Sequence, residues 1–217
     1  MKRALFKVLG MAVVIVLLVL LSAPVSGNRP SRKVIDRRDA INNGRLLHLA
    51  LVNHRADYGS FPGEETMKKI AEEKGIASFP LEASNDYFRL LIADGLTSEQ
   101  AGYCSNPSLP THKPDNVISP LDQAFAKGEV GFAYVAGLPA DSPGDTPLLM
   151  APLIPGTSQF DPNVFDGQAV VILVDGTAKI IEIRKDTGMV MIRGKSLFDP
   201  SAPYWNGKAP AVKYPAH

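Results

Sequence analysis

The sequence predicts an α+β fold in which helices come first and an antiparallel sheet follows. Residues 34–58 carry apolar side chains at helical spacing, and two shorter helical segments come after them. Beyond residue 127 the apolar residues occur in short runs or at every second position, as in strands. Asp175-Gly176 lies between two runs of β-branched residues, which is a strong signal for a hairpin turn.

Residues 1–27 have the composition of a transmembrane anchor or a signal peptide. Basic residues precede VLGMAVVIVLLVLLSA, about 16 residues without a charge, a length between a signal-peptide core and a spanning helix. Cleavage after small residues would start the mature chain near Asn28, whereas retention would leave residues 8–25 as a single anchor in membrane lipid. We favour the anchor, and both alternatives place the remaining domain outside the cytosol.

The body, residues 28–198, is expected to begin with an amphipathic helix from about Val34 to Tyr58. Its predicted core-facing stripe consists of Leu47, Leu51, His54 and Tyr58. Gly59 favours the left-handed conformation that ends a helix, and Pro62 cannot continue one. We therefore expect Tyr58 and Phe61 to turn inward and fix this reversal of the chain.

Two further helices and a loop are expected next. EETMKKIAEEKGI predicts a charged helix that ends at Gly75, and SNDYFRLLIADGL predicts a helix with Ser84 as its N-cap and Gly95 as its closing residue. The predicted buried side of the second helix consists of Phe88, Leu91 and Ile92. Residues 103–127 are rich in proline and predict a surface loop.

Strands are expected in the second half of the body. The predicted segments are residues 130–137, 147–152, 169–183 as a hairpin with Asp175-Gly176 at its tip, and 188–192. Phe132 and Tyr134 are interpreted as core residues. Residues 199–217 contain four prolines and little periodicity, which predicts an irregular C-terminal tail that docks through Tyr204 and Trp205.

Several of these features together resemble the pseudopilins, the pilin-like subunits of bacterial type II secretion systems. They are the hydrophobic N-terminal segment, the helix ending in DYGSFP, the helix SNDYFRLLIADGL and the hairpin FDGQAVVILVDGTAKII, within about Asn42 to Glu182. The resemblance implies a hydrophobic helix and an amphipathic helix packed on a small antiparallel β-sheet. It also implies contacts with other pilin-like or secretion-system subunits.

The N-terminus departs from the pseudopilin pattern. Those proteins are cut after a glycine that precedes the apolar stretch, and they carry a glutamate inside it. Here the apolar stretch has no acidic residue, and Gly10 lies within it, followed by Met11. We therefore expect no processing by a prepilin peptidase and no polymerisation as an ordinary pilin.

Composition narrows the possible partners. The chain has 23 basic and 22 acidic residues, scattered along its length. Because nucleic-acid binding needs a concentrated positive field, nucleic acid is excluded as an expected partner. Cys104 is the only cysteine in the sequence, so an intrachain disulfide is excluded.

The residues that could carry chemistry each have a simpler interpretation. His48 and His54 are six residues apart, which is the wrong spacing for a metal pair on one helix face. Cys104, His112 and Asp115 could form a thiol-based triad, but no flanking signature supports it, and a structural or merely exposed cysteine is expected instead.

Aspartates in turn-rich segments are considered as ligands and as catalytic groups. Calcium could use the oxygen-rich turns around Asp141, Asp145, Asp161 and Asp166. Their spacing matches no compact calcium loop, and aspartate beside proline or glycine is an ordinary turn former. Asp166 and Asp175 stand at opposite ends of one predicted strand, too far apart for an acid/base pair.

We therefore expect no catalytic, cofactor-binding or metal-binding residues. The expected function is that of a non-enzymatic, pilin-like protein, anchored by residues 8–25 in the bacterial cytoplasmic membrane and acting through protein contacts. The alternative is an exported, secreted or periplasmic soluble domain that uses the same scaffold for binding or hydrolysis, because fold does not decide function.

Overall fold

The computed structural model describes residues 30–107 and 109–217. In this part of the chain three α-helices precede the strands, so the predicted α+β class and its order are confirmed. The helices are α2 (Arg32–Tyr58), α3 (Glu64–Lys74) and α4 (Ser84–Ala93), followed by the 3-10 helix η1 (Glu99–Gly102). The strands are β1 (Ala133–Ala136), β2 (Pro147–Ala151), β3 (Gln168–Leu173), β4 (Ala178–Glu182), β5 (Met191–Ile192), β6 (Lys195–Ser196) and β7 (Ala211–Lys213), with η2 (Pro203–Trp205) before β7.

The predicted anchor or signal peptide, residues 1–27, lies outside the described residues. From residue 30 onward, leaving out residue 108, the structure contains no helix that is both long and apolar enough to span a membrane. Residues 31–217 form one unit, which contains all the contacts discussed below.

Helix α2 ends where the sequence predicts. Gly59 adopts φ 80°, in the left-handed region, and its backbone N–H donates to Arg55 O at 2.9 Å. Tyr58 and Phe61 are both buried, and the guanidinium of Arg55 lies 5.0 Å from the centre of the Phe61 ring. Because Tyr134 Oη in the core donates to Pro62 O at 3.0 Å, the reversal after α2 is tied to the sheet.

The start of α4 differs from the prediction. Ser84 is the first helical residue rather than the N-cap, because its hydroxyl donates to Phe132 O at 2.8 Å instead of capping the helix. Asp86 performs the capping: its Oδ2 accepts from the backbone N–H groups of Glu82 and Ala83 at 3.0 and 2.8 Å. The predicted end of the helix is confirmed, since Gly95 follows the C-cap at φ 108°.

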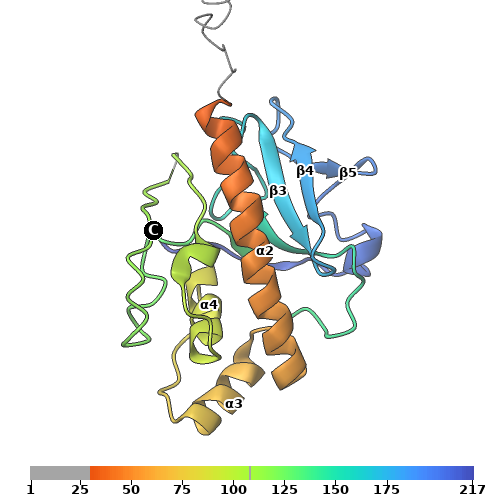
Figure 1. Cartoon of the computed structure of the whole chain (residues 1–217). Helices are drawn as coiled ribbons and strands as arrows, with labels where there is room; N and C mark the ends of the chain where they lie inside the picture. The colour runs from red at the N-terminus through yellow and green to blue at the C-terminus, as the bar shows by residue number, and fades with distance from the viewer. Residues whose placement is uncertain (1–29, 108) are drawn as a thin grey trace, which may run out of the picture. The chain divides into compact units, whose positions relative to one another are not determined.

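The sheet is antiparallel, with strand order β4-β3-β2-β1-β7. The predicted hairpin is formed by β3 and β4, with Val171 opposite Lys179 and Gly176 in the turn at φ 83°. Residues 188–192 contribute β5, which pairs with β6 in a separate two-stranded sheet. Figure 1 shows α2 lying across the large sheet beside β3.

Both faces of the central strands β1, β2 and β3 are covered, which explains why these strands are apolar at almost every position. Alternate residues face opposite sides of a strand. Accordingly Phe132 and Tyr134 belong to the core shared with α2 and α4, whereas Ala133 and Val135 belong to a second core on the other face. The second core is closed by the C-terminal segment, including Tyr204 and Trp205.

The C-terminal segment is therefore more ordered than predicted. Tyr204 and Trp205 are buried as expected, and Trp205 Nε1 donates to Leu197 O at 2.7 Å. The expectation of a wholly irregular tail is wrong for Ala211–Lys213, which form β7 at the edge of the sheet beside β1. Three residues between prolines have too little periodicity to reveal a strand whose partner lies about 80 residues earlier in the chain.

Candidate functional site

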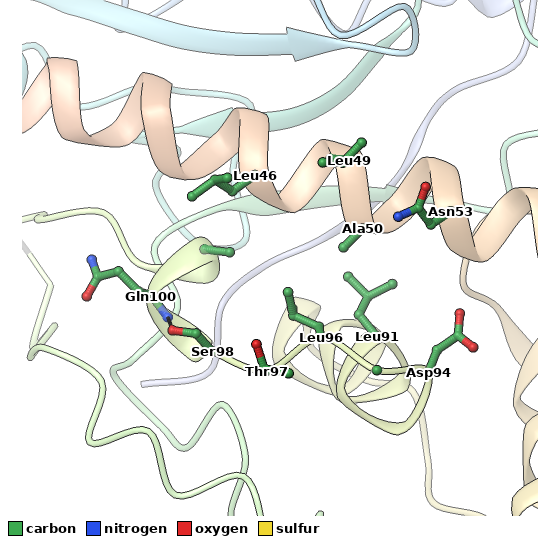
Figure 2. Close-up of a pocket in the computed structure, with 12 residues that line it drawn as sticks. Leu46, Leu49, Ala50, Asn53, Leu91, Asp94, Leu96, Thr97, Ser98 and Gln100 are labelled. Carbon is green, nitrogen blue, oxygen red and sulfur yellow. Dashed lines mark hydrogen bonds between the residues drawn. The ribbon is translucent and has the colours of Figure 1, made fainter.

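A groove separates α2 from the chain that follows α4. Figure 2 shows Leu46, Leu49 and Asn53 on the α2 side, with Leu91 and Leu96 on the opposite side. The groove has a volume of about 380 Å³. Its lining is thus aliphatic in large part and comes from α2 on one side and from the end of α4, the following loop and η1 on the other.

The leucines on the α2 side of this groove are unusually exposed. Leu46 and Leu49 have exposed fractions of 55% and 57%, although Leu47 and Leu51 beside them are fully buried. Ile35, at 38%, is also exposed on α2 and precedes Leu46 by 11 residues, about three helical turns. These three residues, which we call the α2 stripe, therefore share one face of the helix.

One hydrogen bond joins α2 to the chain on the other side of the groove, and others hold that chain in place. The buried side chain of Asn43, on α2, donates through Nδ2 to Tyr103 O at 2.9 Å, directly after η1. Ser98 Oγ accepts from Gln100 N at 3.2 Å and donates to Asn116 Oδ1 at 3.0 Å. The groove is therefore formed by fixed elements before any partner arrives.

The last turns of α2 carry a buried histidine that faces the end of α4. The side chain of His54 is inaccessible to solvent, its Nδ1 is 3.3 Å from Asp94 Oδ2, and its ring centre is 4.8 Å from that of Tyr58. Burial lowers the pKa of His54 to about 4, and the opposing effect of Asp57 is smaller. The ring is therefore neutral near pH 7, and its contact with Asp94 is not an ion pair at that pH.

The two histidines of α2 have different surroundings. His48 is partly exposed and its Nε2 lies 2.9 Å from Val174 O, next to the β3–β4 hairpin. His54 faces α4 instead, through Asp94. The structure thus does not bring these two imidazoles together.

The proposed thiol triad is not assembled either. Cys104 is buried, and burial raises the pKa of its thiol, so the nucleophilic thiolate is disfavoured. Both ring nitrogens of His112 contact backbone carbonyls, Lys113 O at 3.1 Å and Lys127 O at 3.0 Å. The imidazole therefore has no nitrogen directed at Cys104, and the structural interpretation of this cysteine agrees with its place in the core.

The aspartates considered for calcium remain separate turn residues. Asp141, Asp145 and Asp166 are exposed, and Asp161 Oδ1 accepts from Asn163 N at 2.8 Å. In residues 30–107 and 109–217, the one group of three converging carboxylates consists of Glu99, Asp115 and Glu129, and none of these four aspartates belongs to it. Asp175 is a turn residue as predicted, since its Oδ1 accepts from Thr177 N at 2.8 Å.

The sequence interpretation did not identify Leu46 and Leu49 as site residues. Apolar residues on α2 extend beyond the core-facing stripe, at positions 46, 49, 50 and 52. These additional apolar residues are the sequence signal for a second apolar surface, because a helix with one buried face needs only one apolar stripe. It does not show which of the extra residues remain exposed.

Comparison with known proteins gives no match to this chain among protein-family models, curated proteins or solved structures.

Proposed function

We propose that this chain is a non-enzymatic, pilin-like protein of the bacterial cell envelope, held in the cytoplasmic membrane by residues 8–25. Its folded domain lies outside the cytosol and binds neighbouring pilin-like or secretion-system subunits through the α2 stripe and the adjoining groove. The observation that carries this proposal is the exposure of Leu46 and Leu49 on a groove with fixed walls.

The chemistry of the groove favours contact over catalysis. Of the twelve residues that line it, Asp94 is the one with an acidic or basic side chain. A general acid/base reaction or an activated nucleophile needs at least two cooperating groups within hydrogen-bond reach. Exposed leucines beside a polar rim are instead typical of a protein-binding surface.

The position of the groove along the chain also supports a partner in the same membrane. Helix α2 begins seven residues after the end of the proposed anchor, and Leu46 follows 14 residues later. A helical rise of 1.5 Å per residue puts Leu46 about 20 Å along α2 from its start. Only a short length of chain therefore separates the proposed anchor from this surface.

Site-specific photo-cross-linking in cells tests this proposal. A photo-reactive amino acid replaces Leu46 or Leu49 in the full chain, and Ile180, which is 47% exposed on β4, is the matched control. We expect membrane-dependent cross-links to a discrete protein from positions 46 and 49 and none from position 180.

A double variant of the two leucines tests how much they contribute to the affinity for the partner. Burying two half-exposed leucines contributes about 2 kcal/mol, so Leu46→Ser together with Leu49→Ser should weaken the complex roughly 30-fold. Equal cross-linking from all three positions, or no loss of the complex in the double variant, would show that the groove is not the binding surface.

A further inference from the structure

Although basic residues occur along the whole chain, its net charge is divided unevenly. Residues 28–39 contain five basic and two acidic side chains, whereas residues 40–217 contain 15 basic and 20 acidic ones. The short segment around the start of α2 is therefore positive, and the remainder of the domain is negative. Figure 1 shows that α2 begins at one end of the domain, so the basic residues at its start belong to that end.

Two arginines at this end contact the domain but keep donors for another ligand. Arg32 is paired through Nε with Asp36 Oδ1 at 2.9 Å, although 78% of its side chain is exposed. Arg37 is partly buried and donates through Nη1 to Phe165 O at 3.0 Å. Because a guanidinium has five N–H donors, one such contact leaves the others available.

Lys33 and Arg38 have no counter-charge in the domain. Both are exposed, and neither forms an ion pair within residues 30–107 and 109–217. Asp39, the second acidic residue of this segment, is also exposed and is paired with neither of them. In the free domain these two positive charges are therefore balanced by solvent and salt alone.

Neither helix formation nor membrane insertion favours basic residues at this place. The peptide dipoles make the first turn of a helix positive, so acidic residues are preferred there. The first turn of α2 contains Arg32 and Lys33 and no acidic residue. In the expected topology, basic residues are also disfavoured on the exported side of an anchor. An interaction with an external anionic surface accounts for charges that have no role in either process.

The arrangement of the basic residues around α2 fits a flat surface better than the side of another protein. Successive residues of an α-helix are turned by about 100°. Positions 32, 33, 37 and 38 therefore lie on different sides of the helix rather than along one face. They span about 9 Å of the helix axis, a length that extended lysine and arginine side chains can cover. A surface that meets the start of the helix end-on can contact all four.

We propose that Arg32, Lys33, Arg37 and Arg38, which we call the basic ring, contact the phosphate groups of anionic phospholipids and orient the domain with the start of α2 toward the membrane. Guanidinium and ammonium groups are the side chains that bind phosphate oxygens most strongly. The negative remainder of the domain is repelled by the same surface, so attraction at one end and repulsion elsewhere favour one orientation.

The length of chain before α2 permits this contact. The inference rests on the proposed function in one respect, the attachment of the domain to the membrane by residues 8–25. Residues 26–31 separate that segment from α2, and six residues span at most about 20 Å when extended. The tether therefore keeps the basic ring within reach of lipid headgroups.

Energy transfer in lipid nanodiscs tests the orientation. The full chain carries a donor dye at Asn42→Cys, an exposed position on α2, and the disc carries an acceptor dye on its headgroups. The native Cys104 is 1% exposed, so the introduced thiol can be labelled selectively. We expect stronger transfer in discs that contain phosphatidylglycerol than in discs of phosphatidylcholine alone, and a return toward the neutral value at high salt.

Variants without the free charges assign the effect to the basic ring. Each basic residue near an anionic surface strengthens binding about fivefold, so Lys33→Gln with Arg38→Gln should lower the ratio of docked to free domain roughly 25-fold. Lys185→Gln with Lys208→Gln removes the same charge from exposed positions elsewhere and should have little effect.

Three results would overturn the proposal. The first is equal transfer in anionic and neutral discs, and the second is an equal loss in the two double variants. The third is a photo-cross-link in cells from position 38 to a protein, without any effect of lipid charge on energy transfer, which would assign the basic ring to an acidic protein partner.

The lipid contact can be tested independently of the anchor and the groove. A chain that starts near Asn28 keeps the whole basic ring. Sedimentation of that chain with phosphatidylglycerol vesicles, but not with phosphatidylcholine vesicles, would confirm the lipid contact even though the proposed anchor had been removed. Failure of the cross-links from positions 46 and 49 would refute the groove as a binding surface and leave the energy transfer unchanged.

Discussion

At the scale of single residues, the helical pattern of α2 predicts that His54 is buried but does not predict which residue it contacts. Its spacing with Leu47, Leu51 and Tyr58 predicted its burial on the core side of α2, and the structure confirms this position. The pattern could not predict that Asp94, 40 residues later, lies beside its ring, because that contact depends on how α4 packs. Likewise, Glu99, Asp115 and Glu129 are 16 and 14 residues apart, a spacing that matches no local metal motif.

His54 should make the stability of the domain dependent on pH. Its pKa is about 4 in the folded chain and 6.5 ordinarily, so protons bind preferentially to the unfolded state. The contribution of the neutral ring is fully present above about pH 6.5 and is lost as the pH falls toward 4. The raised pKa of Asp94, which arises mainly from burial, acts in the opposite direction, since protonation of Asp94 then favours the folded state.

Comparison with His54→Leu isolates this effect. Between pH 7 and pH 4.5 the wild type should lose about 2 kcal/mol more of its unfolding free energy than the variant does. Urea unfolding of both full chains at the two pH values measures this difference. Parallel losses would mean that His54 is protonated as easily in the folded protein as in the unfolded one.

At the scale of elements, the parts of the fold with strong local signals were predictable. Helix α2 has a stop signal in its own sequence, and the β3–β4 hairpin has its turn dipeptide, so both are found where predicted. Ser84 and β7 were predicted wrongly because their roles depend on distant partners, Phe132 and β1. The groove was missed for the same reason, since the exposure of Leu46 depends on where residues 94–101 lie.

Close packing between α2 and β3 leads to a prediction at this scale. A Cβ at Gly44 would lie 2.9 Å from Ile172 Cγ1 and 3.2 Å from Phe132 Cζ. Gly to Ala within a helix ordinarily stabilises it by about 1 kcal/mol. At this position we expect the reverse, a loss of roughly 1–3 kcal/mol, because both contacts belong to a packed core.

Asn42→Ala is the matched control, since position 42 is exposed on the same helix. It should leave the thermal midpoint unchanged or raise it slightly. Thermal unfolding followed by circular dichroism compares the two variants. If Gly44→Ala were as stable as Asn42→Ala, the helix would lie farther from the sheet than the structure indicates.

At the scale of the whole molecule, the proposed activity depends on the N-terminal segment and the folded domain working together. The domain presents the α2 stripe, and the proposed anchor would hold the domain in the same membrane as its proposed partners. The apolar segment has neither the acidic residue nor the cleavage position of an ordinary pilin. Uncleaved, it would keep the positive charges of Lys2, Arg3 and Lys7, which oppose extraction from the membrane into a filament.

The most direct test of this account is the intact mass of the protein recovered from fractionated bacteria that also express a prepilin peptidase. We predict that the chain remains in the membrane fraction after a carbonate wash, is released by detergent, and has a mass that includes residues 8–25. A soluble chain that starts near Asn28 would contradict the anchor. A chain that starts at Met11, or its presence in sheared surface fibres, would show that the protein is processed and assembled as an ordinary pilin.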